Sequence, residues 1–222
     1  MAFNVIITGA SGMVGRGILL ECLESPEVAH VLVVNRSPLG ISHSKLREVL
    51  LQDFQNVASI AHEFGGYDAC FFAMGVSSVG MKEDAYTRIT FDVVVKFADL
   101  LYGINPNLVF NYVSGAGTDS TERGAIMWAR VKGRTENYVL RKGFRDAYAF
   151  RPGVIVPEKG VKSKTPLYNF LIVLATPFFG LLKKSPSITT TGKIGQAMIR
   201  SMYEDYPVKH LEAKDINRLA TL

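Results

Sequence analysis

The chain has 222 residues, of which 48% are hydrophobic and 20% are charged, which is enough for one domain with a sizeable core. Its formal net charge is +5, but the basic residues are scattered rather than gathered in an aromatic-rich patch, which argues against nucleic-acid binding. No uninterrupted apolar run reaches the roughly 20 residues that a membrane-spanning helix needs.

Apolar, β-branched runs alternate with amphipathic stretches through most of the chain, which predicts a doubly wound α/β fold with a parallel sheet. A continuous apolar run such as 30–35 is typical of a strand buried on both faces. We expect strands at 3–8, 30–35, 49–54, 69–74, 108–114 and 147–151. We expect helices at 13–23, 42–48, 57–64, 82–101 and 125–141.

The alternation changes after Pro152, where we expect a last short strand at 154–157 and closing helices at 191–203 and 208–217. In a doubly wound fold this late part shapes one side of the cleft. There is no internal repeat or linker, so we expect a single domain over 1–222. Its α/β core would occupy 1–156, and a small helical cap and closing region 157–222.

The most apolar stretch, 167–182, has lysines on both sides and is broken by Pro177 and Gly180. It is too short to span a bilayer. Two interpretations stay open. The favoured one is a helix and loop that cap the cleft with an apolar wall. The other is a segment that contacts a lipid surface or a partner, since basic flanks suit an anionic membrane.

A glycine-rich string, TGASGMVG, joins the first expected strand to the first expected helix. Gly9 permits the tight turn, Gly12 lets the backbone approach a phosphate, and Gly15 lets the helix pack against the sheet. The helix N-terminus offers unpaired N–H groups to a pyrophosphate. The pattern predicts a Rossmann-type dinucleotide site that contains Gly9, Ser11, Gly12, Met13, Val14 and Gly15.

The end of the second strand favours NADP over NAD. A site that prefers NAD carries Asp or Glu there, to bind the ribose 2′-hydroxyl. This chain has Asn35 and Arg36 instead, and Arg36 can pair with a 2′-phosphate or stack on the adenine. Arg16 adds positive charge near the glycine string. The alternative is that Arg36 is an ordinary exposed arginine.

These motifs resemble the extended and atypical branch of the short-chain dehydrogenase/reductase superfamily. Within it, the chain looks most similar to small NADP-binding proteins of the Tat-interacting-protein and epimerase/dehydratase-like groups. The resemblance covers about 3–156, including the turn FRPG after the sixth strand. It implies a catalytic serine at Ser114 and a helix lysine at Lys132, followed by Glu136. It also places Asp53, Phe54, Ala73, Met74, Gly75, Lys132, Pro152 and Gly153 beside the cofactor.

The chain departs from this family at the residue that moves the proton. The family uses Tyr-x-x-x-Lys, whose spacing puts both side chains on one helix face and lets the lysine lower the tyrosine pKa. Here Trp128 stands four residues before Lys132. An indole N–H donates a hydrogen bond but cannot shuttle a proton. The resemblance therefore implies catalytic positions Ser114, Lys132 and Trp128, without the ordinary acid.

Other tyrosines offer substitutes. Tyr138 and Lys142 repeat the four-residue spacing, but Lys142 lies at the helix end, too close to the sixth strand, so we reject this pair. Tyr112, on the strand that leads to Ser114, and Tyr86, at the start of the long helix, could donate a proton. Each is favoured as packing or as a structural hydrogen-bonding group.

Three functional hypotheses follow. The first is an atypical NADP-dependent oxidoreductase that acts on a small carbonyl or hydroxyl substrate, as a monomer or homodimer. The second is a catalytically silent NADP-binding sensor or regulator. The third and least favoured is an epimerase or isomerase of a sugar-like substrate, since the chain is short and its late segment is apolar.

Several further features bound the setting. Cys22 and Cys70 lie in apolar contexts and are expected to be buried free thiols. The start of the chain lacks a basic region and a cleavage site, so we expect no signal peptide and a cytoplasmic location. The string Gly-x-Ser-x-Gly is absent, which argues against an α/β-hydrolase. The four histidines show no metal-ligand spacing, so we expect no metal site. They are His30, His43, His62 and His210.

Overall fold

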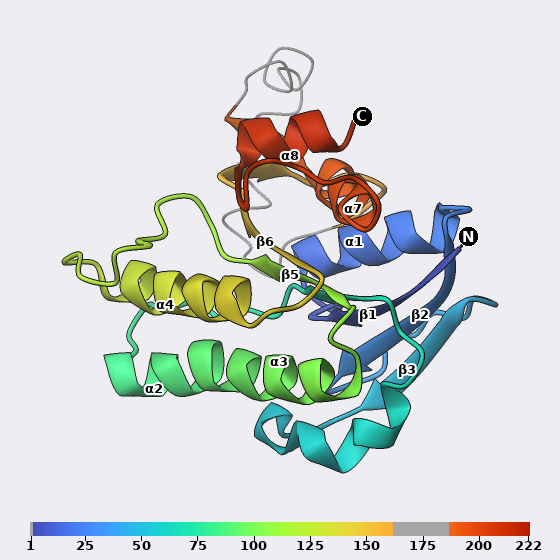
Figure 1. Cartoon of the computed structure of the whole chain (residues 1–222), viewed down its shortest axis with the longest axis horizontal. Coiled ribbons are helices and arrows are strands. Elements are labelled where there is room, and N and C mark those ends of the chain that lie inside the picture. The colour runs from blue at the N-terminus through green and yellow to red at the C-terminus, as the bar shows by residue number, and fades with distance from the viewer. Residues whose placement is uncertain (1, 162–186) are drawn as a thin grey trace.

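The apolar runs of the sequence form one parallel sheet in the computed structural model, which describes residues 2–161 and 187–222 (Figure 1). Its order is β3-β2-β1-β4-β5-β6-β9, and each neighbouring pair is parallel. The order reverses between β1 and β4, so ligands are expected beyond the carboxyl ends of these strands. The strands are β1 (Phe3–Thr8), β2 (Val28–Asn35), β3 (Leu46–Leu50), β4 (Ala69–Phe72), β5 (Val109–Val113), β6 (Asp146–Arg151) and β9 (His210–Glu212).

Helices cover both faces of the sheet, as the alternation of the sequence predicts (Figure 1). A separate two-stranded parallel pair joins β7 (Val154–Val156) to β8 (Ile188–Thr190). One face carries α1 (Met13–Glu24), α7 (Thr191–Arg200) and α8 (Ala213–Leu219). The other carries the 3₁₀ helix η1 (Phe54–Glu63), α2 (Glu83–Thr87), the π-helical turn η2 (Arg88–Asp92), α3 (Val93–Ile104) and α4 (Met127–Arg141).

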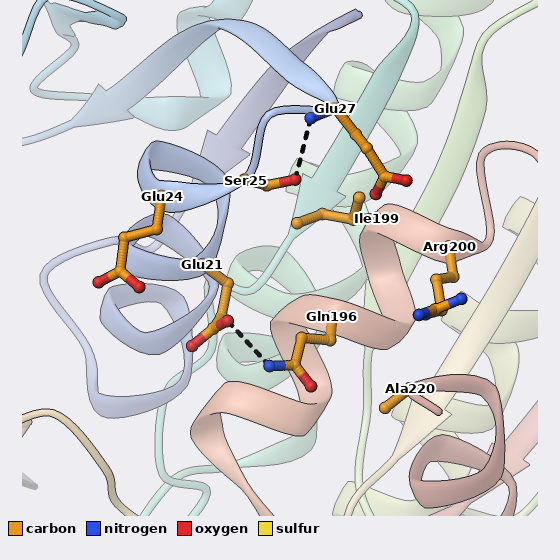
Figure 2. A pocket seen from close by; sticks show the side chains of 8 residues that line it. All are labelled: Glu21, Glu24, Ser25, Glu27, Gln196, Ile199, Arg200 and Ala220. Atoms are coloured by element: carbon orange, nitrogen blue, oxygen red, sulfur yellow. Dashed lines mark hydrogen bonds between the residues drawn. The ribbon is translucent and has the colours of Figure 1, made fainter. Parts of the chain in front are cut away.

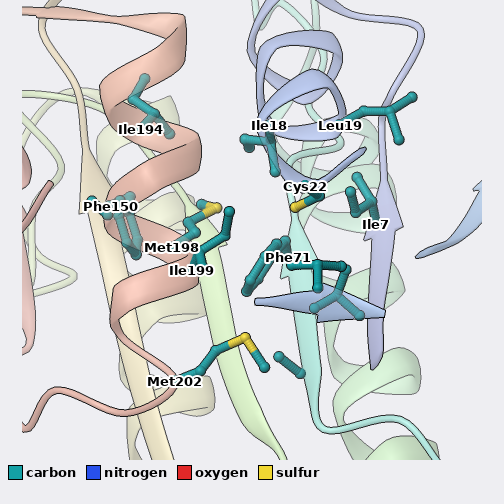
Figure 3. Close-up of a cluster of buried hydrophobic side chains, with 14 of the residues drawn as sticks. Ile7, Ile18, Leu19, Cys22, Phe71, Phe150, Ile194, Met198, Ile199 and Met202 are labelled. Atoms are coloured by element: carbon teal, nitrogen blue, oxygen red, sulfur yellow. The ribbon is translucent and has the colours of Figure 1, made fainter. Parts of the chain in front are cut away.

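The strands contribute side chains to two hydrophobic cores, one on each face of the sheet, because successive side chains point to opposite faces. Ile7 and Phe71 pack against α1 and α7, whereas Ile6 and Phe72 pack on the opposite side with α3. Figure 3 shows the first core, with Cys22 among the side chains of α1 that face α7. Cys22 and Cys70 are buried free thiols, which confirms that prediction.

The predicted helix at 42–48 is wrong. The chain is irregular up to Lys45 and then forms β3 (Leu46–Leu50), so the predicted third strand at 49–54 begins three residues earlier and ends earlier. β3 lies at the edge of the sheet and pairs only with β2. An edge strand is partly solvated and tolerates Arg47 and Glu48, and such a mixed pattern resembles that of a short helix.

Two other predicted helices differ in detail. The helix expected at 82–101 is three consecutive pieces, because the π-helical turn η2 separates α2 from α3. The helix expected at 208–217 is wrong in its first part, where β9 pairs with β6 and extends the sheet. None of the helices in residues 2–161 and 187–222 has both the length and the hydropathy that a membrane crossing requires. The apolar stretch 167–182 lies outside the described residues.

Candidate functional site

The turn between β1 and α1 is held in a conformation that requires glycine. Gly9 has φ +75°, in the left-handed region, and a Cβ there would lie 2.7 Å from backbone atoms of Ala73 and Met74. A Cβ on Gly15 would lie 2.2 Å from the carbonyl oxygen of Gly9. The amide of Gly12 donates to that same oxygen over 2.9 Å and closes the turn. The glycine string therefore keeps β1, α1 and the end of β4 in backbone contact.

The N-terminus of α1 is open to a ligand. Gly12 is the N-cap, no side chain in the described part of the chain caps it, and the first turn carries no acidic residue. Met13, Val14 and Gly15 form that first turn. Their amides have no intrahelical acceptors, and the helix dipole adds partial positive charge. This end of α1 can therefore hold an anion such as a diphosphate.

A single cleft joins this turn to the ends of two neighbouring strands. The predicted cofactor residues that the structure brings together there come from the glycine turn, β2, η1 and the end of β4. Asn35 at the end of β2 joins them, and it was predicted only as a position without a carboxylate. The lining residues are Gly9, Ser11, Gly12, Asn35, Arg36, Phe54, Ala73, Met74 and Gly75.

Arg36 projects from the loop that follows β2. It is exposed, and its guanidinium makes no hydrogen bond or ion pair with the described residues. The carboxylate of Glu48, on the neighbouring strand β3, accepts a hydrogen bond from the amide of Leu39 over 3.0 Å. The side chain of Gln52 holds the Arg36 carbonyl over 2.7 Å. The loop is thus fixed by its backbone while the Arg36 side chain remains available to an anion.

Asp53 and Phe54 have separate positions at the start of η1. Asp53 is the N-cap of η1, and its carboxylate accepts from the amide of Gln55 over 2.9 Å. Phe54 lines the cleft and is largely buried. Asp53 does not line the cleft as described, so the adenine contact implied for it stays a prediction.

Ser114 follows β5 and points into a buried ionic network. Its hydroxyl donates to a carboxylate oxygen of Glu136, and it also lies 3.2 Å from the carbonyl oxygen of Phe150. Glu136 is completely buried on α4. Arg151, at the end of β6, reaches both oxygens of that carboxylate, with its Nε 2.9 Å from Oε1. The fully buried negative charge is therefore paired and hydrogen-bonded, as burial requires.

Lys132 lies one turn before Glu136 on α4 but does not bond to its carboxylate in the described contacts. Its Nζ donates to the backbone carbonyl oxygen of Ser114. Burial disfavours the charged ammonium and lowers the pKa of Lys132 to about 8, against a smaller opposing effect of Glu136. The ammonium is thus held at the carboxyl end of β5 and can lose its proton near pH 8.

Trp128 is half-buried one turn before Lys132, and its ring lies beside the backbone of Gly117. The two tyrosines weighed as proton donors, Tyr86 and Tyr112, are each only 2% exposed. Burial raises the pKa of both phenols. Their surroundings agree with the interpretation of both as packing residues.

The rejected pair, Tyr138 and Lys142, lies on the side of α4 that faces α3. The Tyr138 hydroxyl donates to Asp99, and the Lys142 ammonium pairs with the same carboxylate oxygen over 2.6 Å. That hydrogen-bonded pairing raises the pKa of Lys142. The spacing of these residues is explained by a structural link between two helices.

The turn after β6 lies beside the loop after β5. The carbonyl of Pro152 accepts from the amide of Ala116 over 3.0 Å, and a Cβ on Gly153 would lie 3.7 Å from that of Ala116. A second hollow opens here, lined by small and apolar groups together with a few charges. Its lining residues are Ala116, Arg151, Gly153, Val154, Ser187, Glu212, Ala213 and Lys214.

Figure 2 shows a further hollow, between the carboxyl halves of α1 and α7, with Glu21, Glu24 and Glu27 around it. Its three glutamates already have partners within the protein. Glu21 accepts from Gln196 over 3.1 Å and pairs with Lys159 over 2.5 Å. The hollow lies far along α1 from the glycine turn. No group of three or more His, Cys, Asp or Glu side chains that could hold a metal ion occurs in 2–161 and 187–222.

Known proteins show where this arrangement belongs. Protein HTATIP2 of Rattus norvegicus is 29% identical over 184 residues, which cover 82% of this chain and 72% of that protein. The mitochondrial protein fmp52 of Aspergillus clavatus is 30% identical over 163 residues, which cover 70% of this chain and 68% of the relative. The chain belongs to the atypical short-chain dehydrogenase/reductase superfamily. No protein-family model matches it.

Solved structures share the fold of this chain. The Bordetella bronchiseptica enzyme WbmF in complex with NAD+ has a TM-score of 0.66 at 16% identity, over 99% of this chain and 76% of that one. A UDP-N-acetylglucosamine 4-epimerase from Methanobrevibacter ruminantium has a TM-score of 0.67 at 16% identity, over 94% and 75%. Both confirm the predicted Rossmann-type α/β fold of this short-chain dehydrogenase/reductase.

The ionic network behind Ser114 was missed from the sequence. Glu136 was noted only as a trailing family residue, and Arg151 only as part of a turn. One signal was present. Glu136 interrupts the apolar stripe that α4 buries, between Val131 and Val139, and a charge on such a stripe requires a buried partner.

Proposed function

We propose that this chain binds NADP in the cleft at the ends of β1, β2 and β4 and uses it to interconvert a small carbonyl compound and its alcohol. The observation that carries the proposal is the open N-terminus of α1, set behind a turn whose glycines leave no room for side chains. A diphosphate would take the unpaired amides there. When bound, the cofactor supplies or accepts the hydride.

The residues around the cleft fit a dinucleotide that carries a 2′-phosphate. Arg36 presents a guanidinium without a partner among the described residues, and Asn35 brings no negative charge. A guanidinium can bind a phosphate through two parallel hydrogen bonds. Phe54 and Met74 supply apolar walls in the same cleft. We assign the contact with the cofactor ribose to Lys132, and the far end of the site to Pro152 and Gly153.

Titration calorimetry with NADPH and NADH tests this proposal. We expect NADPH to bind more tightly than NADH by about tenfold, the value of one charged hydrogen-bonded contact. Arg36→Ala should remove most of that preference and leave the affinity for NADH unchanged. Arg218→Ala, which removes an exposed arginine of α8, is the matched control. If neither nucleotide bound to the wild-type chain, the proposal would be wrong.

A catalytically silent NADP-binding sensor is the second candidate. The observation that favours it is the direction of the Ser114 hydroxyl, which donates to Glu136 and would have to turn away before it could donate to a substrate. Trp128 also lacks the proton that a tyrosine would exchange. Oxidation of NADPH with a panel of aldehydes, ketones and quinones separates the two. Tight NADPH binding without turnover of any member supports the sensor.

A further inference from the structure

We propose that the side-chain ammonium of Lys132 is itself the acid that protonates the carbonyl oxygen of the substrate, in the place of the missing tyrosine. This inference rests on the oxidoreductase proposed above and names a role that Lys132 does not have when a tyrosine precedes it. Three features of the described residues carry it: the position of the lysine, the exclusion of other donors, and the direction of the neighbouring carboxylate.

The position of Lys132 places its ammonium at the edge where the site forms. Its Nζ reaches the Ser114 carbonyl just beyond β5, and lies 3.9 Å from where a side chain on Gly115 would begin. β5 pairs directly with β4, and the residues after β4 line the cofactor cleft. Because Gly115 has no side chain, it does not block the path between the ammonium and the space above the strand ends. Lys132 is half-buried as a residue and its ammonium is largely buried, so a substrate would reach the ammonium through the gap that Gly115 leaves.

Other donors near this edge are committed elsewhere. The hydroxyl of Ser114 donates to Glu136, and one hydroxyl has a single proton to give. The phenols of Tyr86 and Tyr112 are buried, and burial raises the pKa of each. The indole of Trp128 donates without exchanging a proton at accessible pH. The ammonium of Lys132 is the donor that remains within this group.

The direction of Glu136 frees Lys132 from a salt bridge. A glutamate four residues after a lysine on a helix commonly pairs with it. Here the carboxylate is turned to Arg151 and Ser114, while His210 Nε2 lies 3.6 Å from its Oε2. The pKa of Lys132 falls to about 8, because burial penalises the ammonium more than Glu136 supports it. A donor that titrates near the working pH is the efficient one for general acid catalysis.

The proposed step balances with the bound cofactor. The carbonyl carbon receives a hydride from NADPH, the C=O π bond breaks, and the oxygen takes a proton from the Lys132 ammonium. Lys132 is left as a neutral amine and regains its proton from water. The net reaction consumes the ketone or aldehyde, one NADPH and one proton, and it yields the alcohol and NADP+.

Replacement by arginine tests the role in catalysis. Lys132→Arg keeps a positive charge and hydrogen-bond donors, but a guanidinium does not release its proton in this pH range. With NADPH and 9,10-phenanthrenequinone or hexanal as probes, we expect wild-type kcat to fall above about pH 8, and kcat of the variant to drop at least about 100-fold. Its affinity for NADPH should stay within about threefold. Lys142→Arg, at the other end of the same helix, is the matched control.

A second measurement needs no turnover. Competitive acetylation of the wild-type chain over a pH series, read by mass spectrometry, reports the titration of each lysine. We expect Lys132 to react half-maximally near pH 8 and to be protected by NADPH, whereas Lys142 should require a much higher pH. If Lys132 titrates together with the surface lysines, the inference is overturned even where Lys132→Arg fails to fold.

The outcomes separate this inference from the proposed function. If Lys132→Arg keeps wild-type kcat, Lys132 is not the acid, although the oxidoreductase stands. If the wild-type chain binds NADPH but reduces neither probe at any pH, the acid role is overturned and the silent sensor is supported. If NADPH does not bind, the proposed function fails as well.

Discussion

Arg151, at the end of β6, binds the buried carboxylate of Glu136 through two hydrogen bonds. Its Nε lies 2.9 Å from Oε1, and its Nη2 donates to Oε2. Through this pair, α4 is fixed to the strand beside β5, and the turn that contains Ser114 is fixed to both. The carboxylate is completely buried and the arginine side chain is 12% exposed, so solvent screens this interaction weakly.

Glu136→Gln should destabilise the protein strongly. The substitution leaves the guanidinium of Arg151 with only the longer, more exposed contact to Glu212 at 3.5 Å, and breaking a buried pair in this way costs about 3–5 kcal/mol. Asp99→Asn, which breaks the more exposed pair with Lys142, should cost less than about 1 kcal/mol. Urea unfolding of both variants measures the difference. Equal losses would contradict the importance assigned to the buried pair.

Gly9→Ala should damage the cofactor turn more than its backbone angle alone explains. The added Cβ would meet the backbone of Ala73 and Met74 at 2.7 Å, and crowding of this kind costs about 1–3 kcal/mol. Gly66→Ala is the control, because Gly66 has a similar φ of +81° but no atom within 4 Å of the added Cβ. Both variants share the strain of positive φ. Thermal unfolding should show the larger loss for Gly9→Ala, and calorimetry should show lost NADPH binding for that variant alone.

Two helical glycines should respond to alanine in opposite directions. A Cβ on Gly133 of α4 would lie 1.8 Å from the carbonyl oxygen of Asp119, so Gly133→Ala must displace the loop before α4, and we expect it to lower stability by about 1–3 kcal/mol. Gly103 of α3 meets nothing within 4 Å, so Gly103→Ala should raise stability by up to about 1 kcal/mol through helix propensity. Denaturant unfolding measures both. A neutral Gly133→Ala would contradict the close approach of that loop.

Lys132→Met should stabilise the folded protein at pH 7 by about 1–3 kcal/mol, because an apolar side chain of similar length removes the penalty of a buried ammonium. The pKa of Lys132 is lowered from 10.5 to about 8 on folding. Between these values the unfolded chain binds more protons than the folded one, so wild-type stability rises with pH in that window. The advantage of the variant should therefore shrink as pH increases from about 8 to about 10. Urea unfolding across this range checks it, and a constant difference would contradict the lowered pKa.

The sequence predicted the elements that packing decides. Apolar runs such as those of β1 and β4 are buried on both faces, and their continuity identified them. β9 was predicted as helix and β3 was placed three residues too late, because both strands lie at the edges of the sheet, where each pairs with a single neighbour and the polar pattern is mixed. The π-helical turn η2 changes the hydrogen-bond pattern without changing the amphipathic period enough to be seen.

The residues of the candidate site likewise fall into those that local sequence motifs predict and those that depend on tertiary packing. The glycine turn and the end of β2 are each a short local signal within one βαβ unit, so their residues could be predicted, and the fold brings them into one cleft. The link from Ser114 to Glu136 and Arg151 joins residues 22 and 15 positions apart. Which carboxylate faces which guanidinium depends on the tertiary placement of α4 against β6, and periodicity carries no information about it.

The close packing of α7 on α1 has a consequence for biogenesis. The side chain of Thr191 occupies the space beside Gly17, so that a Cβ added to Gly17 would lie 2.4 Å from it. The same helix, α7, covers Ile18 and Cys22 of α1. A nascent polypeptide therefore exposes the apolar surface of α1 until the residues of α7 have been synthesised. Chaperone occupancy on ribosome-bound intermediates should persist until α7 clears the exit tunnel.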